Sequence, residues 1–115
     1  MLFSFACFAV GREPLRVLVP ALIRYTGYVA TLARASLRLD HLGDPRGALR
    51  LYRAAGTSGS LAAEVLFGEA RCHRALGDTT AEASALRRLI ALGPGGLHRS
   101  RAEQRLGEIE RRSSN

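Results

Sequence analysis

Residues 42–44 read Leu-Gly-Asp, and the same tripeptide returns thirty-four residues later at 76–78. Glycine readily adopts the left-handed conformation that ends a helix, and the aspartate after it can cap the next helix. A stop-and-cap signal repeated at a period in the thirties is typical of stacked helical hairpins. The chain is therefore predicted to be all-α, with about five helices in antiparallel helix–turn–helix repeats.

Upstream of the first tripeptide, apolar or small residues recur every three or four positions, the spacing of one helix face. These are Leu22, Tyr25, Val29, Leu32, Ser36 and Leu39. Pro20 suits the first turn of that helix, where its missing N–H costs nothing. Pro45 then opens a second helix, which the segment 56–59 ends. The apolar face of this second helix carries Ala48, Leu51, Tyr52 and Ala55.

Three further helices are expected after residue 59. Ser60 is the predicted cap of a helix that Gly77 ends, and a partner helix runs from about residue 80 to 92. Gly-Pro-Gly-Gly at 93–96 stops that helix. The last helix, about 97–111, has a polar outer face that suits the end cap of a stacked array. The expected core positions are Ala63, Leu66, Phe67, Ala70, Ala75, Ala83, Leu86, Leu89, Ile90, Ala102, Leu106 and Ile109.

The repeat domain is expected at residues 20–111, and the two ends of the chain lie outside it. Residues 1–19 form an apolar arm or a signal remnant, and residues 112–115 a disordered tail. The longest charge-free stretch, residues 1–11, is too short to cross a bilayer as a helix. Two interpretations of the arm stay open: a clipped or mis-started export signal, or a hydrophobic segment that folds onto the first helix.

The 115 residues suffice for one small domain, and 47% hydrophobic with 23% charged residues is an ordinary globular balance. The net charge of +7 comes from arginine alone. Arginine forks favour bidentate contacts with anions, although a GC-rich genome would also enrich arginine. The charge is spread along the chain, so no basic tail for nucleic acid is present.

Beyond its period, the sequence resembles the tetratricopeptide repeat family. Small, bulky and aromatic residues occupy the slots of that family's two-helix repeat: Leu32, Ser36, Ala48, Tyr52 and Ala55 in the first copy, and Leu66, Ala70, Leu86 and Pro94 in the second. Glu82 stands where a small residue is expected, and Leu89 where alanine is usual. These two departures indicate a local shift or tilt of the fourth helix.

Segments 62–70, 86–90 and 101–109 are similar to a bacterial subgroup of that family, and the whole resemblance covers about residues 29–111. Members of the subgroup often serve as assembly or scaffold proteins in the cell envelope. The resemblance implies a non-catalytic scaffold or adaptor that binds a protein or peptide. It favours the envelope or periplasm over the cytoplasm and names no pathway.

In such repeats the first helix of each pair lines a concave face. Carried onto this sequence, the resemblance predicts partner-binding residues Leu37, Arg38, His41, Glu64, Phe67, Arg71 and Arg74. Three guanidiniums around an aromatic ring would suit an acidic or carboxyl-terminal peptide. The alternative is that the arginines are solvated, or that their stems shield Phe67.

No residue set predicts catalysis, a metal site or a cofactor. The histidines at 41, 73 and 98 have no ligand spacing, Cys7 and Cys72 form no CxxC pair, and a disulfide between them stays open. We therefore expect no enzyme.

The competing hypothesis is a basic nucleic-acid-binding helical protein, prompted by a pI near 10.9, but scarce aromatics and dispersed charge argue against it. Self-association through the first helix or the arm also stays open.

Overall fold

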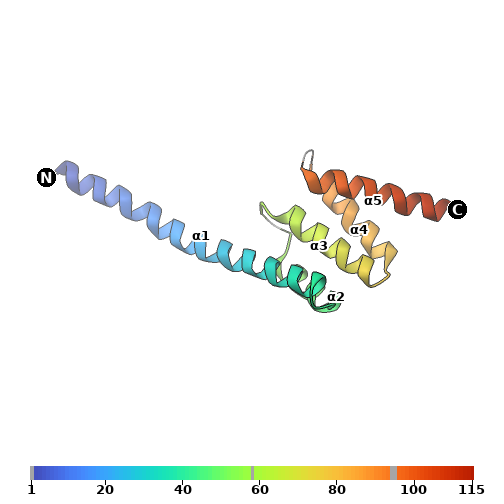
Figure 1. Ribbon diagram of the computed structural model, residues 1–115. Coiled ribbons are helices and arrows are strands. Elements are labelled where there is room, and N and C mark those ends of the chain that lie inside the picture. Colours follow the sequence, from blue (N-terminus) through green and yellow to red (C-terminus); the bar gives the residue numbers. More distant parts are fainter. Residues whose placement is uncertain (1, 58, 94–95) are drawn as a thin grey trace. The chain divides into compact units, whose positions relative to one another are not determined.

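The computed structural model describes residues 2–57, 59–93 and 96–115, with side chains from residue 16 onward. These residues form five helices and contain no strand, which confirms the all-α prediction (Figure 1). The helices are α1 (Leu2–Asp40), α2 (Pro45–Ala55), α3 (Ala62–Ala75), α4 (Thr79–Ala91) and α5 (Leu97–Ser114). The chain divides into two units, residues 1–30 and residues 31–115.

Both copies of Leu-Gly-Asp form the turns that their residues predict. Gly43 and Gly77 have positive φ angles of 60° and 77°. Residues other than glycine rarely adopt this backbone conformation. The Asp44 carboxylate accepts a hydrogen bond from the Gly47 N–H at 2.9 Å and thereby caps α2. Asp78 caps α4 in the same way, through the Ala81 N–H at 3.1 Å. Each aspartate satisfies a donor that a helix start leaves without a partner.

Three helix ends differ from the expectation. Pro20 lies inside α1, which begins at Leu2; a helix that is already running loses one main-chain bond at proline and continues. Leu61, not Ser60, is the N-cap of α3, because its carbonyl accepts the first bond, from the Val65 N–H at 3.1 Å. α5 reaches Ser114, and the last two serine hydroxyls donate to carbonyls four residues earlier.

Some predictions fall on positions outside the described residues. They concern Ser58 in the second helix stop, Pro94 and Gly95 in the third, and the side chains of residues 1–15, Cys7 included. None of the described helices combines the length and apolar content that a membrane-spanning helix requires.

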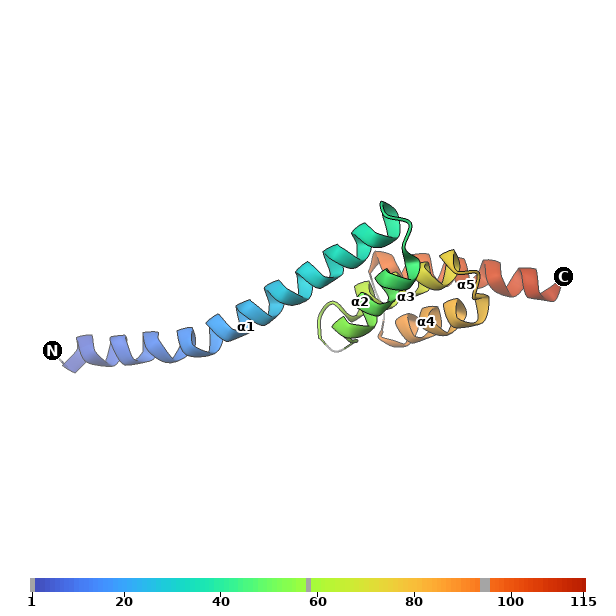
Figure 2. The same ribbon diagram turned by 90° about the horizontal axis from the view of Figure 1, so that it is seen from below.

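Helix α3 is the centre of the second unit, because it packs against α2, α4 and α5 (Figures 1 and 2). The buried core between α3, α4 and α5 consists of Leu66, Ala70, Ala83, Ala85, Leu86, Leu89, Ala102 and Ile109. All of these except Ala85 stand at predicted core positions, whereas Ala75 is exposed. Where α2 crosses α3, the Tyr52 ring lies against the backbone of Gly68. Glycine there allows the close approach of the two helices.

Candidate functional site

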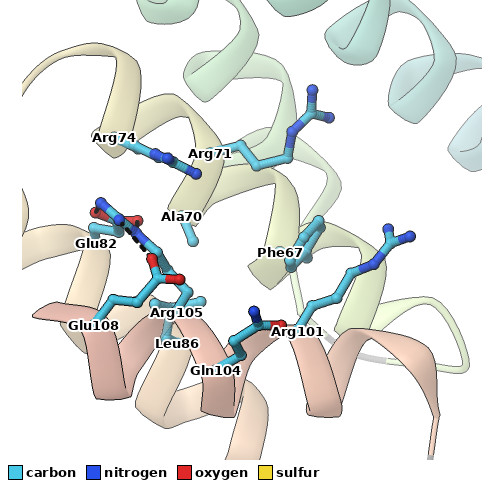
Figure 3. A pocket seen from close by; sticks show the side chains of 10 residues that line it. All are labelled: Phe67, Ala70, Arg71, Arg74, Glu82, Leu86, Arg101, Gln104, Arg105 and Glu108. Carbon is cyan, nitrogen blue, oxygen red and sulfur yellow. Dashed lines mark hydrogen bonds and ion pairs between the residues drawn. The ribbon is translucent and has the colours of Figure 1, made fainter.

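A hollow of about 230 Å³ lies between α3 and α5, with α4 beneath it (Figure 3). We call it the α3–α5 groove. It is lined by Phe67, Ala70, Arg71 and Arg74 of α3, Glu82 and Leu86 of α4, and Arg101, Gln104, Arg105 and Glu108 of α5. The α3 and α5 residues recur at helical spacing, so one face of each helix supplies one wall. The groove thus combines apolar side chains, such as Phe67 and Leu86, with charged side chains on its walls and floor.

The floor of the groove contains a buried ion pair. The Glu82 side chain is only 3% exposed. It accepts two hydrogen bonds from Arg105, from Nε at 2.7 Å and from Nη2 at 3.0 Å. Arg105 also donates to Glu108 at 3.2 Å. The bond to Glu82 is the main reason that the pKa of Arg105 is raised. Glu82 and Glu108 thus share one guanidinium.

One α3 arginine of the groove is tied to α1. Arg71 donates to the Asp40 carboxylate near the end of α1. Burial raises the pKa of Asp40, but the hydrogen bonds from Ser36 and Arg71 outweigh it and leave the pKa below its usual value. Arg71 therefore serves a structural contact as well as lining the groove.

The other two arginines that project into the groove carry no such contact. Among the described residues, neither Arg74 nor Arg101 has a carboxylate partner. Both are exposed, and they extend from opposite walls in Figure 3. Since Arg105 and Arg71 are already paired, the positive charge available to a ligand resides on these two guanidiniums.

Phe67 forms the apolar part of the opening. Its ring packs against the His98 imidazole, with centroids 4.8 Å apart. His98 Nε2 lies 2.7 Å from the Glu64 carboxylate. Phe67 is only partly buried, and it lines the groove together with Arg101.

The structure brings three of the seven predicted partner-binding residues into the groove: Phe67, Arg71 and Arg74. Glu64 is engaged with His98 outside the groove lining. Arg38 binds the cap residue Asp44 at 3.0 Å and so stabilises the turn between α1 and α2. Leu37 and His41 are exposed and do not line the groove. In this groove the wall opposite α3 comes from α5 and not from α1, and partner binding by Leu37, Arg38 and His41 stays a prediction.

The groove residues of α5 are not among the predicted site residues. Their spacing, Arg101, Gln104, Arg105 and Glu108, is one helix face and could have indicated a shared surface. In the sequence, that face is polar, as the solvent-exposed side of a capping helix would be. Which side of α5 faces α3 depends on how Ala102, Leu106 and Ile109 pack, and those residues belong to the core or contact it.

The remaining candidate chemistry is structural. Cys72 is a free thiol that is fully buried, and burial raises its pKa to about 11. A thiol with this pKa stays protonated at neutral pH and is a poor nucleophile. His73 is buried as well, whereas His41 is exposed. Within the described part of the chain, no three ligand-type side chains gather to hold a metal ion.

Comparison of the chain with protein-family models, with curated proteins and with solved structures finds no match. The tetratricopeptide resemblance therefore rests on the residues of this protein alone. The function proposed below rests on the charge and shape of the groove.

Proposed function

We propose that the chain is a non-catalytic protein-interaction module, a scaffold or adaptor that binds an acidic peptide in the α3–α5 groove. The observation that carries this proposal is the pair Arg74 and Arg101, two exposed guanidiniums without carboxylate partners among the described residues, on opposite walls of one hollow. Each guanidinium can donate charge-assisted hydrogen bonds to a carboxylate of an acidic peptide that lies along the groove. An acidic side chain has this chemistry, and so does the free carboxyl end of a peptide.

The size of the groove favours part of a peptide over a free cofactor. A hollow of about 230 Å³ is smaller than the roughly 300–1,000 Å³ of typical small-molecule sites. The exposed side of Phe67, with Ala70 and Leu86 beneath it, offers an apolar contact next to the guanidiniums. A peptide with a carboxylate and a neighbouring apolar side chain would match both features.

The proposal includes a tetratricopeptide-like arrangement of residues 20–111. Two features support it. The connections α1–α2 and α3–α4 each contain a left-handed glycine followed by a capping aspartate, thirty-four residues apart. Short connections also place successive helices next to one another from α2 to α5.

The test is fluorescence anisotropy of the full-length protein with labelled octapeptides that carry two or three aspartates or glutamates, each made with a free and an amidated C-terminus. The double variant Arg74→Glu with Arg101→Glu should weaken binding at least tenfold, because each charge-assisted bond is worth roughly 1.5–3 kcal/mol. Arg38 and Arg71 are less suitable targets, since each holds an aspartate that stabilises the fold.

The matched control is Arg46→Glu with Arg112→Glu, which makes the same change of net charge at two exposed positions outside the groove. The control should bind nearly as the parent does. Equal weakening by both double variants would reveal non-specific charge attraction and contradict the groove. Binding to a labelled oligonucleotide that survives physiological salt would instead favour the nucleic-acid hypothesis.

A further inference from the structure

The segment 16–30 of α1 exposes a continuous apolar stripe. Leu18, Leu22, Tyr25 and Val29 are 50%, 52%, 52% and 40% exposed. Their separations of four, three and four residues place them on one face of the helix. Val17 and Ile23 are exposed as well. An uncovered apolar face of this extent indicates a surface that docks onto something.

The charge of the same segment has a single sign. No acidic residue occurs from residue 14 to residue 39. Arg16 and Arg24 are exposed, and none of the described side chains forms an ion pair with them. At 100° per residue, each lies roughly 130° or more around the helix from the centre of the apolar stripe. Val17, Val19 and Ile23 lie roughly 90–130° from the same centre. The segment therefore has an apolar stripe, further exposed apolar residues beside it, and two arginines on the side opposite the stripe as its only charges.

We propose that residues 16–30 dock on an anionic lipid surface as an interfacial helix, with the apolar stripe in the acyl boundary and the arginines among the headgroups. Helices with one apolar face and arginine on the polar face lie in the plane of the interface. Tyr25 suits that depth, because its ring is apolar and its hydroxyl is polar. Such docking needs no bilayer-spanning helix.

A second copy of the protein suits the stripe less well. Another segment 16–30 would bring the same arginines and no acidic residue, so two such segments would gain no charge compensation from each other. An anionic lipid surface, by contrast, complements both features, because its acyl chains suit the apolar stripe and its headgroups suit the arginines.

The experiment is flotation of the full-length protein with vesicles of phosphatidylcholine alone and of phosphatidylcholine with 30% phosphatidylglycerol. We expect strong partitioning to the anionic vesicles only. Replacing Arg16 and Arg24 by serine should weaken that partitioning about 25-fold, since each basic residue near such a surface contributes about fivefold. Leu22→Glu with Val29→Glu should abolish it.

The matched control is Leu42→Glu with Leu97→Glu, two leucines that are 62% and 61% exposed in the second unit. These changes should leave partitioning unaltered. Circular dichroism of every variant verifies that the helices remain. Equal partitioning to neutral and anionic vesicles would overturn the proposal. So would the absence of vesicle binding together with concentration-dependent dimers in light scattering that Leu22→Glu removes.

Discussion

The Glu82 carboxylate and the Arg105 guanidinium form a two-point hydrogen-bonded pair at 2.7 and 3.0 Å in the floor of the groove. Glu82 occupies a position where the repeat pattern calls for a small residue. Its burial is compatible with folding because Arg105 approaches from α5 and neutralises it. This pair links α4 to α5 in the floor of the groove.

We therefore expect Arg105→Met to destabilise the protein by about 3 kcal/mol, since it leaves Glu82 charged and without its partner in a buried place. The double variant Glu82→Met with Arg105→Met should recover most of that loss, because two apolar side chains need no partner. Urea unfolding followed by circular dichroism measures both. If the double variant were as unstable as the single one, packing rather than charge would explain the effect.

A second prediction concerns Gly68, whose backbone lies against the Tyr52 ring. Gly68→Ala would place a methyl group inside that ring, so α2 and α3 would have to separate, at a cost of roughly 1–3 kcal/mol. Gly107→Ala is the matched control, because nothing lies within 4 Å of the added carbon. The control should stabilise the protein by about 0.5–1 kcal/mol through helix propensity. Thermal unfolding that shows equal shifts for the two variants would contradict the close contact.

The cap residue Asp44 predicts how stability depends on pH. The pKa of Asp44 lies below its usual value mainly because its carboxylate accepts a hydrogen bond from the Gly47 N–H, and secondly because it accepts one from Arg38. Since the folded pKa is below the unfolded one, this stabilisation is complete above about pH 4 and disappears as pH falls through the folded pKa. Asp44→Asn retains a capping oxygen but cannot titrate. Unfolding midpoints between pH 2 and 7 should therefore decline less steeply for this variant than for the parent.

Burial of Cys72 predicts slow chemical modification. With a pKa of about 11 and no exposed surface, the thiol should react with iodoacetamide at pH 7.5 only when the fold opens. Mass spectrometry of the peptide that contains Cys72 measures the rate, and adding urea should accelerate it steeply. Rapid labelling in the absence of urea would show that the α2–α3 contact opens readily.

The helices and their turns could be predicted from the sequence because their causes are local. A glycine that permits positive φ and an aspartate that caps the next helix act within a few residues, at Gly43 and Asp44 as at Gly77 and Asp78. The periodic apolar residues of α3, α4 and α5 likewise indicated most of the core, although Ala75 is exposed and the buried Ala62, Val65, Cys72 and Ala85 were not among the predicted positions.

The groove could not be predicted, because it depends on contacts between residues far apart in the sequence. Glu82 meets Arg105 across 23 positions, and Asp40 meets Arg71 across 31. Arg38 and Arg71 appeared equivalent in the sequence, yet one stabilises a turn while the other lines the hollow.

Local chemistry thus determined where each helix begins and ends in the repeats. Only the packing of α5 against α3 and α4 decided which arginines remain available to bind a partner, since the partners of a side chain depend on how the helices rotate to bury their apolar faces.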